Sequence, residues 1–299
     1  MGAVSALVMV EGLPGSGKST TSHAIAGWLA DHQVAAEHWA EGRTDHPVDF
    51  EQVAVLSRGD LPAIAAEWPE ASQALLRAAE PLGDAWVVRE QQHAGLPPEL
   101  VERLRLHDAY DGDVSAELHS QVLTDSWRRF GATTPDVVHV WECVLLQNPV
   151  CALVARADQP VDVLARHVAG LVDAVRSHAP ALVYLDVGDP LAALERAASE
   201  RPAEWLDFVV EYHTRQGLGL RCGLSGFEGY VEFMRRRREM ELEVLDTLDL
   251  PMVVVPVGDG RWHEHEAVIR TFVAGHLGLD REARRAVRRV ATPEAQPVA

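Results

Sequence analysis

The glycine-rich segment at residues 12–19 reads GLPGSGKS, and it constrains the fold of this chain more than any other feature. It matches the pattern G-x-x-x-x-G-K-[S/T], whose glycines let backbone N–H groups surround a phosphate. A short apolar run at residues 4–10 precedes it, and a helical pattern at residues 18–31 follows it. A strand, a phosphate-binding loop and a helix in this order predict a nucleoside triphosphate site on an α/β fold.

Each residue type in this segment suits a phosphate site. Lys18 would reach the β- and γ-phosphates. The hydroxyl of Ser19 would bind Mg²⁺, an ion that keeps several waters and takes few protein ligands. The expected cofactors are therefore ATP and Mg²⁺. The residues expected to contact ATP here are Gly12, Leu13, Pro14, Gly15, Ser16, Gly17, Lys18, Ser19 and Thr20.

Lys18 is the only lysine among the 299 residues, whereas every other long basic side chain is an arginine. A broad, planar guanidinium does not replace a compact ammonium inside a tight phosphate loop. The presence of lysine at this one position therefore supports its role in phosphate binding. It also excludes a guanine-specific GTPase, because the N-K-x-D motif that reads guanine needs a second lysine.

Further short apolar runs predict the rest of a sheet. Runs of this length suit the interior of a parallel sheet that is covered by helices. We therefore expect a three-layer α/β fold of the P-loop NTPase type with five parallel strands, at residues 4–10, 34–41, 137–141, 182–186 and 252–257.

A single domain is expected over residues 1–280, followed by a C-terminal tail at residues 281–299. The segment between the second and third strands is much longer than a minimal crossover. We expect it to form a helical insertion at about residues 50–135 that binds the acceptor, and we expect a lid at about residues 196–225. Helical periodicity in the insertion is clearest near residues 61–79, 98–106 and 115–129.

The composition limits the partners. The formal net charge of −18 repels nucleic-acid backbones, and the arginines at residues 235–238 lie among glutamates in a helical pattern, which predicts a solvated face. No apolar run approaches the roughly twenty residues that span a bilayer. Three cysteines at irregular spacing favour a cytoplasmic location. We expect a small-molecule acceptor, no nucleic acid and no membrane, and the sequence leaves a homodimer open.

Carboxylates follow two of the predicted strands, at the edge where ligands bind in open α/β sheets. Glu142 is the candidate Mg²⁺ ligand beside Ser19, although it could instead be an exposed side chain at a strand end. Glu41 is the candidate base that orients or deprotonates the acceptor hydroxyl. The residues Asp45, His46 and Asp49 could hold acceptor hydroxyls, but a turn rich in Gly, Asp and Pro also uses these residue types.

Three further segments offer candidate residues. Asp186, after the fourth strand, would join the Mg²⁺ shell through water or cap the next helix. Arg196 and Arg201 would close over the γ-phosphate, or serve the dipole at a helix end. Arg261 and Trp262 follow the last strand and would stack on the adenine ring.

With these residues the chain resembles P-loop nucleoside and nucleotide kinases, especially thymidylate kinase and the deoxynucleoside kinases. The likeness is strongest in EGLPGSGKST and in VYLDVGDPLAALERAASERPAEW. It implies that Arg196 and Arg201 are lid arginines. It also aligns Glu41 with the glutamate that ends the second strand, and Glu142 with the acidic residue of a D-R-Y or E-R-S segment.

The chain departs from those kinases directly after Glu142. Cys143 and Val144 follow, where the family has an arginine that holds the sugar or phosphate of the substrate. This departure favours an acceptor other than an ordinary nucleotide. The stretch WECVLLQNPV also looks like the equivalent stretch in a group of uncharacterised bacterial P-loop proteins that share EGLPGSGKST.

These features together predict an ATP-dependent phosphotransferase. It would move the γ-phosphate to a hydroxyl or phosphate of a nucleoside, a nucleotide or a hydroxylated metabolite such as an antibiotic. One alternative is a regulatory protein that hydrolyses or senses ATP without a small-molecule acceptor, and another is a pseudokinase that binds nucleotide without turnover. An enclosed pocket is favoured by the aromatic side chains of the insertion, Trp68, Trp86, Tyr110 and Trp127.

Overall fold

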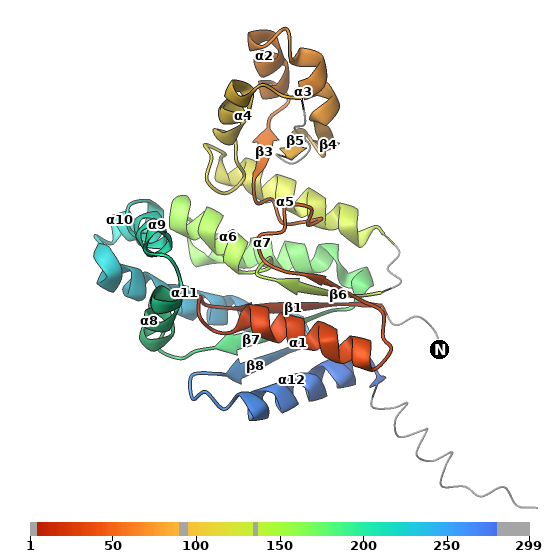
Figure 1. Ribbon diagram of the computed structural model, residues 1–299, viewed down its shortest axis with the longest axis vertical. Helices are drawn as coiled ribbons and strands as arrows, with labels where there is room; N and C mark the ends of the chain where they lie inside the picture. Colours follow the sequence, from red (N-terminus) through yellow and green to blue (C-terminus); the bar gives the residue numbers. More distant parts are fainter. Residues whose placement is uncertain (1–4, 90–94, 134–136, 280–299) are drawn as a thin grey trace, which may run out of the picture.

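A computed structural model describes residues 5–89, 95–133 and 137–279. Its main element is a five-stranded sheet in which every strand runs parallel to its neighbours (Figure 1). The strands lie in the order β2-β6-β1-β7-β8, so that β1 is central. Their bounds are β1 Ala6–Gly12, β2 Ala36–Trp39, β6 Val138–Glu142, β7 Pro180–Asp186 and β8 Met252–Pro256.

The burial of the strands follows from their place in the sheet. Every residue of β1 is buried, as is every residue of β6, whereas the edge strands β2 and β8 are partly exposed. Continuous apolar runs are expected where helices cover both faces of a parallel sheet. The predicted α/β fold with five parallel strands is therefore confirmed, and all five carboxyl ends meet at one edge.

Helices flank this sheet on both faces. In Figure 1, α1 and α12 lie in front of the strands, and α7 and α11 lie on the other side. The bounds are α1 Lys18–Asp31, α5 Ala116–Gly131, α6 Gln147–Pro149, α7 Val161–Ala174, α8 Leu191–Glu200, α9 Ala203–Thr214, α10 Gly217–Arg221, α11 Gly226–Asp246 and α12 Trp262–His276, with a π-helical segment η2 Val150–Arg156 and a short 3-10 helix η3 Arg176–His178.

The insertion after β2 differs from the helical one that the sequence predicts. It contains a three-stranded antiparallel sheet in the order β3-β5-β4 as well as helices, and this part projects from the main body (Figure 1). It has its own apolar core, which includes Leu56, Ile64 and Leu75. Its elements are β3 Val53–Leu56, α2 Asp60–Glu67, α3 Ser72–Ala78, β4 Glu80–Leu82, β5 Ala85–Arg89 and α4 Pro98–Arg105.

Within the described residues, no helix combines the length and apolar character needed to cross a membrane. The predicted C-terminal tail at residues 281–299 lies outside the described residues. The segment predicted as a lid corresponds to the end of α8 with α9 and α10, which lie beside the carboxyl edge of the sheet (Figure 1).

Candidate functional site

The glycine-rich loop joins the central strand β1 to α1, and its backbone requires glycine. Gly15 has φ 78° and Gly17 has φ 91°, in the left-handed region that other residues rarely adopt. A Cβ on Gly15 would lie 2.5 Å from the carbonyl oxygen of Ala193, and one on Gly17 would lie 2.5 Å from the Trp262 ring. The hydroxyl of Ser16 is buried without a hydrogen-bond partner inside this loop. The loop therefore forms a tight turn at the amino end of α1, where N–H groups are free to bind an anion.

Ser19 and Glu142 are in direct contact, although 123 positions separate them in the chain. The Ser19 hydroxyl donates to Glu142 Oε1 at 2.5 Å, and the Ser22 hydroxyl lies 3.2 Å from Glu142 Oε2. His38 Nε2 lies 2.9 Å from the Ser22 hydroxyl. These contacts hold a buried carboxylate beside the hydroxyl of the glycine-rich loop, and oxygen groups of this kind are the ligands that Mg²⁺ prefers.

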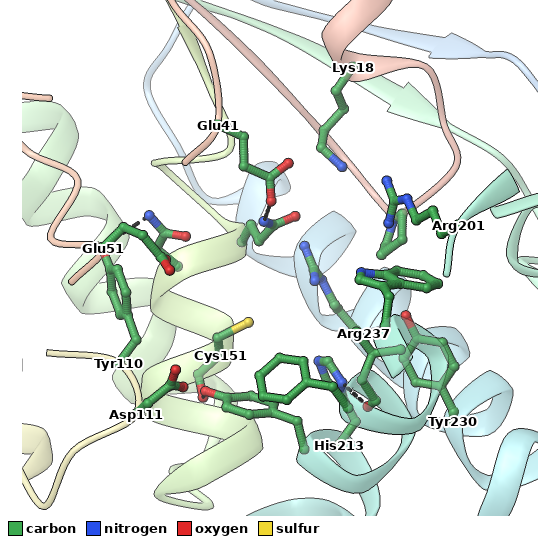
Figure 2. A pocket seen from close by; sticks show the side chains of 17 residues that line it. Lys18, Glu41, Glu51, Tyr110, Asp111, Cys151, Arg201, His213, Tyr230 and Arg237 are labelled. Atoms are coloured by element: carbon green, nitrogen blue, oxygen red, sulfur yellow. Dashed lines mark hydrogen bonds between the residues drawn. The ribbon is translucent and has the colours of Figure 1, made fainter. Parts of the chain in front are cut away.

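Lys18 and Glu41 face the same space (Figure 2). Burial opposes the charge of Lys18, but neighbouring acidic groups, Glu41 and Glu11 among them, outweigh it and raise the pKa of the ammonium. Partial dehydration would raise the pKa of Glu41, yet Lys18 and a hydrogen bond from Gln147 lower it. Both groups are therefore charged at neutral pH, and Glu41 remains a hydrogen-bond acceptor.

Glu41, Glu142 and Cys143 bring one ligand atom each to within 4.8 Å of one another. The Cys143 thiol donates to Glu41 Oε2 at 3.3 Å, and burial raises the pKa of this thiol well above its usual range. The thiol is therefore neutral, so the two carboxylates are the oxygen ligands that this cluster offers to a hard cation.

Glu11 is an acidic residue inside the otherwise apolar central strand, and it is fully buried. Its carboxylate accepts hydrogen bonds from the backbone N–H groups of Leu145 at 2.6 Å, Leu146 at 3.1 Å and Gln147 at 3.3 Å. These N–H groups lie where α6 begins, and they have no partner within the helix. Glu11 therefore fixes the segment that follows Glu142 against β1.

Burial, followed by repulsion from Glu241, raises the pKa of Glu11 from 4.5 to about 7. The folded state thus binds a proton at Glu11 that the unfolded state has released between these two pH values, so the free energy of unfolding falls as pH rises from about 4.5 to about 7. One pKa unit is worth about 1.4 kcal/mol. Above pH 7, where Glu11 is ionised in the folded state as well, the free energy of unfolding is therefore lower by on the order of 3 kcal/mol than it is below pH 4.5. We expect the free energy of unfolding of the Glu11→Gln variant to lack this fall between pH 4.5 and pH 7.

The prediction for Glu11 is checked by urea unfolding of both proteins at several pH values between 4.5 and 8. The exposed Glu228→Gln change is a matched control and should keep the wild-type profile. Parallel curves for wild type and Glu11→Gln over this range would contradict the assignment.

A cavity of about 240 Å³ opens beside Lys18 and Glu41 (Figure 2). Its wall carries the cations Lys18, Arg201 and Arg237 and the carboxylates Glu41, Glu51 and Asp111. In Figure 2 the basic groups lie on one side and Glu51 and Asp111 lie on the other. The apolar and aromatic surface comes from Pro14, Cys151, Trp205, Phe208, Val209, Tyr212 and Tyr230.

Hydrogen bonds from a half-buried arginine position part of the acidic side of the cavity. Arg156 of η2 donates to the carbonyl oxygens of Tyr110 at 2.6 Å and Gly112 at 2.7 Å, which fixes the loop that carries Asp111. Burial and the neighbouring carboxylate of Asp49 raise the pKa of Glu51 to about 7. Glu51 is therefore partly protonated near neutral pH, unlike Glu41.

The three predicted acceptor-binding residues do not line this cavity. Asp45 is exposed and pairs with Arg43 at 2.6 Å. His46 packs between Trp39 and Trp141, and its Nδ1 accepts backbone hydrogen bonds. The sequence pattern could not separate such a turn-forming role from contact with a ligand.

Asp49, the third of these residues, acts behind the cavity wall. It accepts hydrogen bonds from the Tyr110 hydroxyl at 3.0 Å and from the Asn148 amide at 3.0 Å, and both of these side chains line the cavity. Of the four aromatic side chains expected to enclose a pocket, only Tyr110 does so, because Trp127 lies in the main core and Trp68 and Trp86 pack in the projecting part.

The remaining predicted residues have varied surroundings. Asp186 forms a two-pronged ion pair with Arg238, at 2.6 and 2.7 Å, which occupies both carboxylate oxygens. Arg196 is exposed on α8, whereas Arg201 lines the cavity and stacks on Trp205 with its guanidinium 4.2 Å from the ring centroid.

The pair predicted to stack on adenine is divided between two environments. Trp262 covers Gly17 of the glycine-rich loop. Arg261 is exposed and pairs with Asp259 and Glu264, at 2.7 Å in each case. Only the tryptophan ring of this pair is therefore in contact with the loop.

Sequence reasoning missed Arg237, which lies in the run of four arginines predicted to form a solvated face. That prediction is wrong for Arg237, which is 1% exposed and pairs with Glu241 at 2.7 Å inside the protein. Arg235 and Arg236 are at the surface, as expected. A glutamate four residues after Arg237 is the only local signal, and Glu239 gives the same signal for Arg235.

No protein-family model matches the chain, and the curated proteins likewise contain no match. A functional assignment therefore depends on the residues and their geometry.

Proposed function

We propose that this chain is an ATP-dependent small-molecule kinase with a fold of the P-loop NTPase type, similar to nucleoside and nucleotide kinases. One observation carries the proposal. The glycine-rich loop contributes Pro14 and Lys18 to the wall of a partly open cavity that also contains Glu41, and its Ser19 contacts Glu142. A protein that only senses or hydrolyses ATP has no need of a second cavity beside the γ-phosphate position.

The residues at the loop fit ATP and Mg²⁺. Positive-φ glycines, the buried unpartnered Ser16 hydroxyl and the free N–H groups at the start of α1 suit phosphate oxygens. Ser19 and Glu142 would hold Mg²⁺, since a hydroxyl and a carboxylate are oxygen donors of the right kind. When bound there, Mg²⁺ would offset negative charge on the phosphates.

The chain's own groups would do the rest by position and charge. Lys18 would stabilise the charge that develops on the transferred phosphoryl group, and Arg201 would approach it from the side of α9. Glu41 would accept a hydrogen bond from the acceptor hydroxyl and take its proton. Glu11 would hold the segment after Glu142 in place through its three backbone hydrogen bonds.

The proposal is tested by mass spectrometry of reactions that contain the full chain, Mg·ATP and a mixed panel of nucleosides, nucleotides and hydroxylated antibiotics. A product heavier by one phosphoryl group that depends on ATP would establish a kinase and name the acceptor class. Slow loss of ATP without any phosphorylated product would contradict the kinase and favour a regulatory ATPase.

A further inference from the structure

Two carboxylates in the wall of the cavity have no partner within the described part of the chain. Glu51 is half-buried, and Asp111 is more exposed, on the loop between α4 and α5. Among the described residues, no hydrogen bond or ion pair reaches either side chain. Figure 2 shows both carboxylates on the side of the cavity away from Lys18. Both are therefore open to a ligand in the cavity.

The carboxylates behind this wall are bound by the protein itself. Asp49 accepts hydrogen bonds from the Tyr110 hydroxyl and the Asn148 amide, each at 3.0 Å. Asp108 accepts from the backbone N–H groups of Tyr110 at 2.9 Å and Asp111 at 3.0 Å. The protein thus supplies donors to the two carboxylates behind the wall and none to the two in the wall.

The negative charge of this side of the cavity is not balanced by a neighbouring cation. Arg156 donates to the carbonyl oxygens of residues 110, 112 and 114, at 2.6, 2.7 and 2.5 Å, and no ion pair joins it to the described side chain of Asp111. Burial and then repulsion from Asp49 and Asp108 raise the pKa of Glu51 to about 7. A bound cation would offset this repulsion.

A metal ion does not fit this side of the cavity. Among the described residues, the group of three side chains that brings possible metal ligands together consists of Glu41, Glu142 and Cys143. Glu51 and Asp111 do not form such a group with a third described residue. An ammonium ion has three donors of its own and is attracted to carboxylates and to aromatic faces, which Tyr110 and Tyr212 supply in the same cavity.

We propose that the acceptor is a hydroxylated amine whose ammonium group binds to Glu51 and Asp111 while its hydroxyl lies at Glu41. The inference rests on the proposed function for the identity of the reacting end. Lys18 and Arg201 at the phosphate end repel an ammonium, so the charges of the wall favour one orientation of the acceptor. Trp205 and Phe208 supply apolar surface for the rest of the molecule.

Neutral and anionic groups fit the acidic side less well. A carboxylate or phosphate would add negative charge beside Glu51 and Asp111. A hydroxyl can donate a hydrogen bond to one of them, but it leaves their charge unbalanced. An ammonium held by these carboxylates keeps its proton, so its nitrogen has no lone pair and the hydroxyl is the group that takes the phosphoryl group.

Three probes that differ only at one end test this chemistry. The cavity volume of about 240 Å³ corresponds to roughly eight waters at about 30 Å³ each, which suits a ring with two short substituents. The probes are 4-(aminomethyl)benzyl alcohol, 1,4-benzenedimethanol and 4-(hydroxymethyl)benzoate. At neutral pH they carry a positive charge, no charge and a negative charge.

Binding of each probe to the full chain is measured by calorimetry without nucleotide, and phosphoryl transfer is measured separately by mass spectrometry with Mg·ATP. We expect the amine to bind at least about tenfold tighter than the diol, and the benzoate to bind most weakly. Equal or tighter binding of either competitor, or no binding of the amine at millimolar concentration, would overturn the inference. Selective binding of the amine without transfer would keep the inference and count against the kinase alone. Transfer to all three probes without a preference in binding would do the reverse.

Glu51→Gln and Asp111→Asn test the two contacts. We expect each variant to weaken binding of the amine about two- to tenfold and to leave binding of the diol nearly unchanged. The melting temperature should not fall, because neither carboxylate has a partner among the described residues. In phosphoryl transfer to the amine the loss should raise KM, since the ammonium is bound equally before and during the reaction.

Asp113→Asn is the matched control. Asp113 is an exposed carboxylate on the same loop as Asp111, and it does not line the cavity. Its replacement makes the same change of charge and should leave the preference among the probes unchanged. If Glu51→Gln and Asp111→Asn weakened all three probes equally, or if Asp113→Asn reduced the preference as much as they do, the proposed contacts would be wrong.

Discussion

Replacing Lys18 with alanine is expected to lower kcat/KM for phosphoryl transfer by about a hundredfold to a thousandfold, while the protein stays folded. The lysine would stabilise negative charge that is larger in the transition state than in bound ATP, and a loss of one such fixed charge costs about 3 to 4 kcal/mol. The ammonium lies at the cavity wall with a raised pKa, so it is fully charged at pH 7. Steady-state kinetics of both proteins with the acceptor found by mass spectrometry gives the ratio.

Lys18→Arg is the matched control for charge. It keeps one positive charge but replaces the compact ammonium with a wide planar group. In the native chain the ammonium nitrogen lies 3.2 Å from the Leu13 carbonyl oxygen, which leaves little room for such a group. We expect this variant to lose nearly as much activity as alanine. If either variant kept more than a tenth of the wild-type rate, the role proposed for Lys18 would be wrong.

The main sheet could be predicted from the sequence because its signals are local. The strands β1, β6 and β7 are apolar runs whose residues are nearly all buried, so composition alone marks them. The strands of the projecting part were missed. β4 has three residues and β5 has five, and they lie in a segment where helical periodicity dominates.

The candidate site was predictable where each residue has a fixed place relative to a strand end. Glu142 and Ser19 were expected to lie together at the Mg²⁺ site, and the Ser19 hydroxyl oxygen lies 2.5 Å from Glu142 Oε1. Arg237 could not be found in this way, because neighbouring residues on a helix point about 100° apart and four arginines in a row leave the inward one undetermined. Its burial depends on α11 packing on distant elements of the chain.

Glu41→Gln is expected to lower kcat about a hundredfold or more at pH 7, with a much smaller change in KM. On the proposed mechanism Glu41 accepts the proton of the acceptor hydroxyl, and general bases contribute about 10² to 10⁴ in rate. The amide of glutamine can still accept a hydrogen bond, so binding of the acceptor would be largely kept. Glu51→Gln is the matched control, because Glu51 is another carboxylate of the same cavity.

The pH dependence of kcat separates these two carboxylates without any mutation. The pKa of Glu41 is lowered, chiefly by Lys18 acting against dehydration, so a rate that depends on ionised Glu41 stays constant from pH 8 down to about pH 5. The pKa of Glu51 is about 7, so a rate that depends on ionised Glu51 falls tenfold for each pH unit below 7. A steep fall in kcat between pH 7 and pH 5, together with a larger loss of kcat in Glu51→Gln than in Glu41→Gln, would contradict the role proposed for Glu41. Glu51 would then be the base, and the reacting hydroxyl would lie on the acidic side of the cavity.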